Sequence, residues 1–574
     1  MMNQKTYILI FLLLWSVAGG AQIPGTMFHK VMEEQMQKSM GSLRIPGMPN
    51  PFYIGANIVD QNRIVVHSSL GSLLKASESR NRGTQNLQVL VGDYNNSNLN
   101  SNQPNESIYP FRARTNITAG DCFDETRRRL WLVFDRAYKM SVDLYSAKQS
   151  SNKNVTASEW TDVPDFMPGK AIQVDLPAID LKFENDKLIK YTNAISASLK
   201  AYPQLTYSWV RLTGTKANIY YSNTEGTKAS YPNSIVRLVV NAETLTADGE
   251  KLELYQTYHV GTEAELPPLE LVLSDTKEIA NTLLEIRNAP VFNDVYNGPV
   301  LFEGPAASEV VRKTMFYAGQ ENLYAKRERR TNAQQTSSGS NKISTELRIN
   351  TRIASEALSV KACPKKSEFN GISLIGTYPV DMEGTVPPEE LVLIENGILK
   401  NLLCGRIPTL KMKESNGHLR VPAYSGMPVI APGVIDVDFK NAVTKEELKK
   451  QLLESAKADG LNYAIIVREM TSNLSELRRV YQVDVNTGKE TLVRSAGFNT
   501  LVLNDLRKII GASNQKRVLN TTSGEDTNHR IDYLSGCPAT FITPDAFLFK
   551  DIEISKSTKP NLNKLPVVKN PLEM

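Results

Sequence analysis

The most informative hydrophobic pattern lies over residues 298–319, GPVLFEGPAASEVVRKTMFYAG. An apolar, strand-like run is followed by a Gly-Pro turn and a short segment with apolar residues at helical spacing. Pro305 suits a first helical position because its missing N–H would be unpaired there, and Gly319 suits the residue after the last turn. The pattern predicts a helix over roughly 306–318. Arg312 and Lys313 do not lie on the most apolar side of this predicted helix. The simplest interpretation is that both belong to its solvated outer face.

Similar patterns predict the other elements. Helical spacing of apolar residues predicts helices near the amino terminus in MFHKVMEEQMQKSMGSL, over 123–149, and from about Ser274 to just before Pro290. Thr444 and Glu447 form a capping box for one more helix, which Gly460 ends. Strand-rich sequence over 207–260 contains turn signals at 224–226 and 248–249, and the pairs at 396–397 and 486–489 are further hairpin turns. Loops are predicted over 94–116 and 325–345. The hairpin density favours an α+β fold with a strand-rich carboxy-terminal part.

Length and composition indicate a multidomain globular protein, and the amino-terminal segment indicates export from the cytoplasm. A chain of 574 residues needs two or three hydrophobic cores, and its 41% hydrophobic and 22% charged residues are ordinary values. A net charge of +5 is too dilute to indicate nucleic-acid binding. Lys5, the apolar run 7–18 and the small residues 19–21 have the three parts of a secretory signal, so we expect cleavage after Ala21 and a periplasmic or otherwise exported protein. The run is too short for a membrane span, and no second candidate follows.

No local catalytic motif is present. The five histidines are not paired at metal-ligand spacing, and the chain has no serine-hydrolase elbow, dinucleotide fingerprint or P-loop. His418, in a predicted turn, is either a polar turn residue or a residue of a substrate cleft. Glu303, just before the helix at 306–318, is either a carboxylate near a cleft or a salt-bridge or capping residue. For the four cysteines, a Cys363–Cys404 disulfide and unpaired thiols both remain open.

The segment 298–319 resembles the zinc-site segment of the TldD/PmbA (modulator of DNA gyrase) metallopeptidase family. Catalytic members continue into H-E-x-x-x-H, whose imidazoles hold zinc and whose carboxylate polarises a metal-bound water. Those positions here are Arg312, Lys313 and Tyr317, so the resemblance favours a cleft-facing site that has lost its metal. Further blocks resemble the family in the same order; they cover residues 67–94, 123–149, 223–226, 381–403, 413–420 and 541–554. Cys537 is the one candidate for the cysteine ligand of the family, but it falls several residues after the expected place.

The resemblance implies a TldD/PmbA-like α+β fold with a β-barrel-like carboxy-terminal domain. The predicted parts are a signal peptide (1–21), an amino-terminal domain (22–125), a central domain (126–290), a metallopeptidase-like domain (291–554) and a Pro-rich tail (555–574). It further implies a TldE-like subunit without zinc that completes the peptide chamber of a zinc-bearing TldD-like partner. Unfolded peptides would be the substrate. Two alternatives stay open: an active metallopeptidase with dispersed ligands such as His418, Cys537 and Glu303, and a stand-alone peptide-binding or scaffold protein.

Overall fold

A computed structural model describes residues 24–100, 115–117, 122–152, 162–316, 322–325, 327, 345–422, 428–470, 477–498, 501–523, 534–557 and 572. The predicted signal peptide, most of the Pro-rich tail, most of the predicted loop at 325–345 and Tyr317 lie outside the described residues. No helix in the described ranges is long and apolar enough to cross a membrane.

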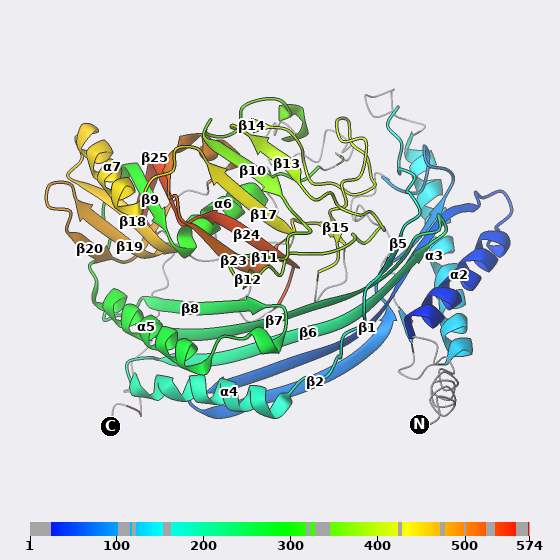
Figure 1. Cartoon of the computed structure of the whole chain (residues 1–574), viewed down its shortest axis with the longest axis horizontal. Helices are drawn as coiled ribbons and strands as arrows, with labels where there is room; N and C mark the ends of the chain where they lie inside the picture. Colours follow the sequence, from blue (N-terminus) through cyan, green and yellow to red (C-terminus); the bar gives the residue numbers. More distant parts are fainter. Residues whose placement is uncertain are drawn as a thin grey trace, which may run out of the picture.

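An eight-stranded sheet dominates the amino-terminal half (Figure 1). Its path runs β4-β2-β1-β6-β7-β5, with β3 paired to β1 and β8 paired to β7. The strands are β1 (Pro51–Ser69), β2 (Ser72–Thr84), β3 (Leu87–Val91), β4 (Thr115–Asn116), β5 (Gln173–Asp175), β6 (Tyr207–Asn223), β7 (Lys228–Leu245) and β8 (Lys251–Val260).

The predicted hairpins of this sheet are confirmed. Strands β6 and β7 pair antiparallel across the turn at 224–227, and β7 and β8 pair across the turn at 246–250. Gly226 and Gly249 have φ values of +92° and +85°, which a side chain rarely allows. The predicted loop over 94–116 needs one correction, because its last two residues form strand β4.

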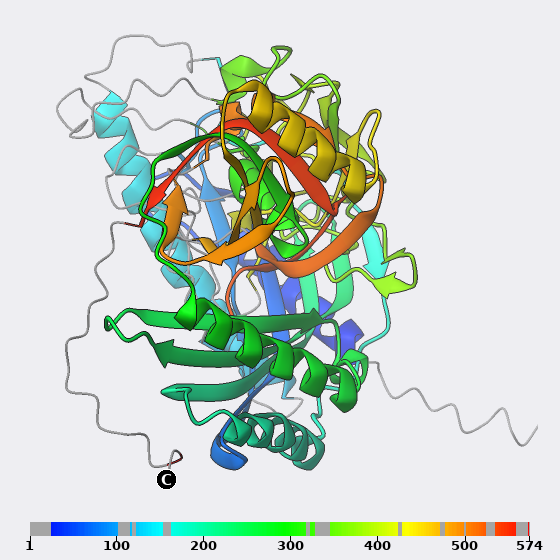
Figure 2. The same cartoon turned by 90° about the vertical axis from the view of Figure 1, so that its left-hand side faces the viewer.

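Helices cover one face of this sheet. The side chains of α2 (Pro24–Ser42) and α3 (Phe123–Asn152) pack on β1, β3 and β6, and those of α4 (Asn185–Ser198) and α5 (Leu269–Asn288) pack on β1, β6, β7 and β8. Figure 2 shows α4 and α5 side by side below the carboxy-terminal part. The helix predicted to start near Ser274 begins five residues earlier, because Pro268 precedes an apolar first turn that also packs on the sheet.

Two more large sheets build the carboxy-terminal half. The six-stranded sheet has the order β14-β13-β10-β17-β24-β23, and the seven-stranded sheet has the order β20-β19-β18-β9-β25-β21 with β22 paired to β25. The first contains β10 (Leu358–Ala362), β13 (Leu391–Glu395), β14 (Ile398–Leu399), β17 (Val434–Phe439), β23 (Lys516–Ser523) and β24 (Cys537–Pro544). The second contains β9 (Tyr296–Glu303), β18 (Tyr463–Met470), β19 (Leu477–Asp484), β20 (Glu490–Val493), β21 (Ala496–Phe498), β22 (Ile509–Ala512) and β25 (Ala546–Lys556).

Shorter elements complete this half. Two short strand pairs belong to it, β11 (Glu368–Phe369) with β12 (Ile372–Ser373) and β15 (Leu419–Arg420) with β16 (Val429–Ile430). It also contains the 3-10 helices η3 (Thr345–Arg348) and η4 (Leu503–Lys508). The 3-10 helices η1 (Leu199–Ala201) and η2 (Glu263–Glu265) belong to the amino-terminal half. The turns predicted at 396–397 and 486–489 join β13 to β14 and β19 to β20.

The two large carboxy-terminal sheets enclose a shared core. Helix α6 (Pro305–Phe316) contacts strands of both sheets, and its apolar residues belong to the largest buried cluster. Helix α7 (Lys445–Ala458) packs on the other side of the seven-stranded sheet, and its N-cap Thr444 accepts a hydrogen bond from the N–H of Glu447 at 3.3 Å, as predicted. The predicted α+β fold with a strand-rich carboxy-terminal half is confirmed.

Candidate functional site

The segment that resembles the zinc motif consists of strand β9, a tight turn and helix α6. Gly304 in the turn has a φ of +59°, where a side chain would be strained, and its N–H donates to the carbonyl oxygen of Asp545 at 2.8 Å. A Cβ at this position would lie 3.2 Å from Nη1 of Arg517. Pro305 is the first helical residue, as predicted. The turn therefore sets the direction in which α6 enters the core.

Arg312 and Lys313 are buried and share one carboxylate. Their side chains are 7% and 0% exposed. Arg312 donates to Oε2 of Glu309 from Nε at 3.1 Å and from Nη2 at 2.8 Å, and Nζ of Lys313 lies 3.7 Å from the same oxygen. Burial lowers the pKa of Lys313 to about 8; Glu309 opposes this shift, whereas the charges of Arg312 and Arg478 add to it. Lys313 is therefore mostly protonated at pH 7.

The interpretation of Arg312 and Lys313 as a solvated outer face is wrong. Every residue of α6 from Ala306 to Phe316 is buried except Glu309. Hydrophobic periodicity identifies the most apolar side of a helix, but α6 contacts β9 and β18 on one side and β23 and β24 on the other. Its polar side is therefore covered as well. The alternative, a position facing a substrate cleft, stays a prediction.

The donor atoms at the zinc-motif positions do not fit a zinc ion. A guanidinium has no lone pair to donate, and a lysine with a pKa of about 8 is mostly an ammonium at neutral pH. The third position, Tyr317, lies outside the described residues. Within the described ranges, no group of three or more His, Cys, Asp or Glu residues is arranged to hold a metal.

Glu303, the last residue of β9, lies in the lining of a cavity of about 350 Å³ between the two halves. Its Oε2 accepts a hydrogen bond from Nε of Arg468 at 2.9 Å, and Arg468 also pairs with Glu490. Glu303 is therefore a salt-bridge residue that lines a cavity, and its role as a carboxylate of a substrate cleft stays a prediction. The remaining lining comes from β8, α5, α7, β18, β19 and the turn before α6, and its polar members include Gln256, Asp275, Glu278, Lys445, Glu469 and Arg479.

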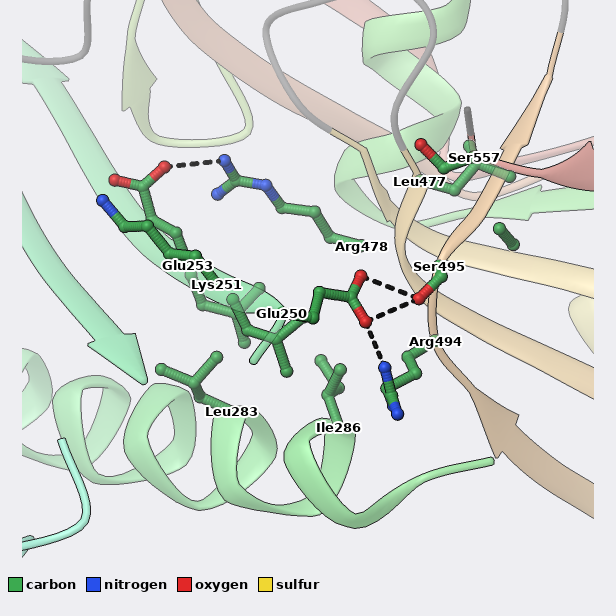
Figure 3. A pocket seen from close by; sticks show the side chains of 13 residues that line it. Glu250, Lys251, Glu253, Leu283, Ile286, Leu477, Arg478, Arg494, Ser495 and Ser557 are labelled. Carbon is green, nitrogen blue, oxygen red and sulfur yellow. Dashed lines mark hydrogen bonds and ion pairs between the residues drawn. The ribbon is translucent and has the colours of Figure 1, made fainter. Parts of the chain in front are cut away.

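A second cavity of about 230 Å³ has Leu254 in common with the first cavity. Figure 3 shows the side chains that line this second cavity. Ion pairs between the two halves frame it. Glu250 pairs with Arg494 and accepts a hydrogen bond from Oγ of Ser495 at 2.7 Å, and Oε2 of Glu253 lies 3.2 Å from Nη2 of Arg478. Its apolar lining consists of Leu252, Leu254, Leu283, Ile286, Leu477 and Ala496. The cavity thus combines apolar side chains with charges of both signs.

His418 is fully buried in a turn of the carboxy-terminal half. Its Nδ1 lies 2.8 Å from the carbonyl oxygen of Asn416, and its ring meets Tyr378 edge to face at 6.2 Å. Among the described residues, Nε2 is buried and has no hydrogen-bond partner. Burial lowers the pKa of His418 to about 3, so the imidazole is neutral. Its assignment as a turn residue or a cleft residue stays a prediction.

The three residues of the predicted dispersed metal site do not meet. Cys537 is the first residue of β24, whereas Glu303 pairs with Ala546, two residues beyond the end of that strand. At about 3.3 Å per residue, the eight residues of β24 therefore separate Cys537 from the end of the strand that lies next to Ala546 by about 23 Å. Nδ1 of His418 is already engaged with the Asn416 backbone.

A buried polar network around Arg406 joins three of the family-like blocks. Arg406 donates from Nη2 to Oε1 of Glu225 at 2.7 Å, and Tyr94 donates to the same oxygen at 2.7 Å. The N–H of Arg406 donates to Oε2 of Glu383 at 2.8 Å, and the N–H of Glu383 donates to Oδ1 of Asp381 at 2.9 Å. Burial raises the pKa of both Asp381 and Glu383. Sequence reasoning did not find this network, although charged residues inside otherwise apolar family-like blocks are a signal for it.

The four cysteines, all of them described, form no disulfide. Of the two arrangements that the sequence left open, the structure has the one with thiols. Cys404 is buried and its Sγ donates to the carbonyl oxygen of Glu414 at 3.2 Å, while Cys363 lies half-buried beside Lys366. Burial raises the pKa of Cys404 to about 12, so this thiol is not reactive at neutral pH.

Comparisons with known proteins agree with the fold described above. Residues 297–555 match the PmbA/TldA metallopeptidase C-terminal domain. The structure is similar to TldE from Thermococcus kodakarensis, with a TM-score of 0.57 and 13% identity over 92% of this chain and 100% of that chain. Similar too are putative modulators of DNA gyrase from Thermotoga maritima (TM-score 0.54, 13% identity, 92% and 100% covered) and Bacteroides thetaiotaomicron (0.55, 10%, 92% and 98%). At these identities the likeness concerns the fold. No curated protein matches the chain.

Proposed function

Since this chain carries a PmbA/TldA metallopeptidase C-terminal domain and belongs to the TldD/PmbA family, we propose that it is an exported, TldE-like subunit without zinc. The observation that carries the proposal is the chemistry of α6. Arg312 and Lys313 stand where the zinc-bearing members have ligand and base, and both are buried cations held by Glu309. Such a site repels a dication, so catalysis would have to come from another chain.

The proposed partner is a TldD-like subunit with an intact H-E-x-x-x-H motif. This chain would complete the wall of a chamber in which the partner cleaves unfolded peptides. The surrounding strand, turn and helix remain intact although the metal ligands are replaced, which is what a docking and binding role requires. The leader over residues 1–21 supports export of this subunit to the periplasm.

Peptide would bind through its backbone at the edge of the eight-stranded sheet. Strand β8 ends the sheet beside β7, and Leu254 and Gln256 of this strand line the cavity that contains Glu303. A strand edge offers N–H and C=O groups to an extended chain of any sequence. The position of both cavities next to β8 supports this mode.

The test combines metal analysis with reconstitution. We expect the purified mature chain to contain far less than one zinc per chain by elemental analysis and to cleave no unfolded peptide. Mixed with the H-E-x-x-x-H protein encoded by the same host, it should form a stable complex in size-exclusion chromatography and produce or raise peptidase activity. A partner whose motif glutamate is replaced by Gln is the control, because it should bind equally well and remain inactive.

Two results would contradict the proposal. Stoichiometric zinc in the isolated chain would restore the metallopeptidase alternative. The absence of a complex, together with unchanged activity of the zinc-bearing protein, would favour a stand-alone binding protein.

A further inference from the structure

The wall of the cavity that contains Glu303 has more acidic than basic side chains. This cavity of about 350 Å³ is bounded by β8 and α5 of the amino-terminal half and by β18, β19, the start of α7 and the turn before α6 in the carboxy-terminal half. Its volume is within the range of small-ligand sites. Besides Glu303, its acids are Asp275, Glu278 and Glu469, and its bases are Lys445, Arg468 and Arg479.

Acids outside the wall take up part of the positive charge. Nη1 of Arg468 lies 2.8 Å from Oε2 of Glu490, in addition to the hydrogen bond that Arg468 donates to Glu303. Nζ of Lys445 pairs with Asp545. Neither Glu490 nor Asp545 lines the cavity. A single cation of the wall is therefore left for the other three acids.

Two of those three acids have no cation partner in the part of the chain that the structure describes. Arg479 is shared with Glu278, whose Oε1 lies 3.5 Å from its Nη1. Asp275 has a neutral partner instead, because its Oδ2 accepts a hydrogen bond from the hydroxyl of Tyr258 at 2.6 Å. Oε2 of Glu469 is buried and has no hydrogen-bond partner. Asp275 and Glu469 therefore remain as carboxylates without a cation.

The two arginines whose charges act on Glu469 are engaged elsewhere. They are Arg479 and Arg478, and among the described contacts neither donates a hydrogen bond to this carboxylate. Nη2 of Arg478 lies 3.2 Å from Oε2 of Glu253, in the second cavity (Figure 3). Glu469 as a whole is half-buried, so its carboxylate belongs to the wall of the first cavity and is not sealed beneath it.

The surroundings of Glu469 are those of a cation site without its cation. Burial raises the pKa of this carboxyl group, although the two arginines oppose the shift. A carboxylate held away from water without a partner is unfavourable, and a bound cation would offset that cost. Leu254, Ile279 and Pro305 line the same cavity. The wall thus offers carboxylates to a charged group and apolar surface to a hydrocarbon stem.

An ammonium group fits this wall better than a metal ion or a guanidinium. Within the described ranges, no three His, Cys, Asp or Glu side chains are arranged to hold a metal. A guanidinium is planar and prefers two acceptors in a fork, whereas Asp275 and Glu469 come from different elements, α5 and β18. An ammonium has three donors that point in different directions. It can therefore bind acceptors from both halves.

We infer that this cavity binds the ammonium group of an unfolded peptide, with Glu469 and Asp275 as its acceptors. The amino terminus of a peptide and the side chain of a lysine share this chemistry. The inference rests on the proposed function and adds a specificity site to it. Leu254 and Gln256 of β8 line the cavity, so a peptide bound along the edge of β8 lies next to these carboxylates.

Fluorescence anisotropy with the purified chain tests the inference. Four unfolded peptides share one sequence without other charged side chains and carry the dye at the carboxy terminus. The first has an acetylated amino terminus and norleucine at one internal position, and the second has a free amino terminus and the same norleucine. The third and fourth have the acetylated terminus with Lys or Arg in place of norleucine.

The variants are Glu469→Gln and Asp275→Asn, which keep the shape of the side chains and remove their charge. Glu270→Gln is the matched control, because Glu270 lies on the same helix as Asp275 but is exposed and outside the wall. Circular dichroism verifies that each variant is folded. Glu469→Gln removes an unpaired charge and should not destabilise the protein, so it carries the test if Asp275→Asn does not fold.

We expect at least one of the two ammonium peptides to bind about fivefold or more tightly than the uncharged peptide. The one with the higher affinity identifies the source of the ammonium group. Glu469→Gln should reduce this preference to less than about twofold and leave the affinity for the uncharged peptide unchanged. Asp275→Asn should reduce the preference in part, and Glu270→Gln should keep it in full.

Three results would overturn the inference and leave the subunit proposal intact, because complex formation and zinc content test that proposal separately. They are equal affinity for all four peptides, a preference that survives Glu469→Gln, and tighter binding of the Arg peptide than of either ammonium peptide. Failure to bind any of the peptides would overturn both the inference and the peptide-binding part of the proposed function.

Discussion

The neutral state of His418 follows from its surroundings at the scale of single residues. The side chain is buried, its Nδ1 faces the carbonyl of Asn416, and the nearby charge of Arg420 disfavours a second proton. Burial is the larger of these effects on the pKa, which falls to about 3. The sequence predicts a polar turn here, but its histidine is buried and packs in the neutral form.

The pH dependence of stability tests this state. An unfolded histidine takes up its proton near pH 6.5, whereas folded His418 does so only near pH 3. Below pH 6.5 the unfolded state thus binds more protons, and the free energy of unfolding falls by at most about 1.4 kcal/mol per pH unit as pH decreases. Urea unfolding between pH 6 and 4.5 should show a shallower fall for His418→Gln than for the wild type. An unchanged slope would mean that His418 is protonated in the folded protein.

At the scale of elements, helix α6 shows how charged side chains come to be buried between two sheets. Its start at Pro305 follows from local backbone rules, but its polar side is covered by β23 and β24 of the six-stranded sheet. Glu309 stabilises Arg312 and Lys313 there, at 2.8 and 3.7 Å from one oxygen. Burial still disfavours the charge on Lys313, as its lowered pKa indicates.

Replacement of the buried ammonium should stabilise the protein. For Lys313→Met we expect a free energy of unfolding about 1–3 kcal/mol higher at pH 7, because the side chain keeps its volume and loses an unfavourable charge, while Glu309 keeps Arg312. The pKa of Lys313 falls from 10.5 to about 8 on folding, so the penalty is complete below pH 8 and disappears as pH rises towards 10.5.

Urea unfolding at pH 7 and pH 9.5 measures this effect. The gain for Lys313→Met should be smaller at pH 9.5. Lys450→Met on α7, where the lysine side chain is 64% exposed, is the control and should change little at either pH. A loss of stability in Lys313→Met would show that the ammonium makes a net favourable contribution to α6.

Arg406 connects the two halves at the scale of the whole molecule. It lies in the carboxy-terminal half but donates to Glu225 in the turn between β6 and β7 and to the carbonyl oxygen of Met167, and its guanidinium lies 4.1 Å from the ring centre of Phe166. With 2% side-chain exposure it is one of the largest fully buried side chains. Its loss would leave Glu225 as a nearly buried, uncompensated carboxylate.

We therefore expect Arg406→Met to lower the free energy of unfolding by about 3–5 kcal/mol, the usual effect of removing one partner of a buried ion pair. Adding Glu225→Gln should recover part of this loss, since the unpaired charge is then removed. Lys187→Met, which breaks the exposed pair with Glu184, is the control and should change stability by less than about 1 kcal/mol. Thermal unfolding followed by circular dichroism gives all three values, and a similar effect of the Arg406 and Lys187 changes would contradict the role of Arg406.

The sequence by itself determined the features that depend on a few neighbouring residues. Pro305, Gly304, the Thr444 cap and the hairpin turns act through backbone dihedrals and hydrogen bonds within about one turn, so their patterns located helices and strands. Helix α5 begins five residues before the predicted start, because its apolar first turn packs on the sheet and is stabilised by that tertiary contact. The order of the family-like blocks likewise indicated the fold, since each block specifies local structure.

Only the tertiary structure decided which of these residues are buried and which meet. Burial of Arg312 and Lys313 depends on two sheets whose strands lie far away in the sequence. The Arg406–Glu225 pair depends on packing of the two halves against each other, which brings together residues far apart in the sequence. Electrostatic interactions and desolvation act through space, so a linear pattern gives the charge of a side chain but not its environment.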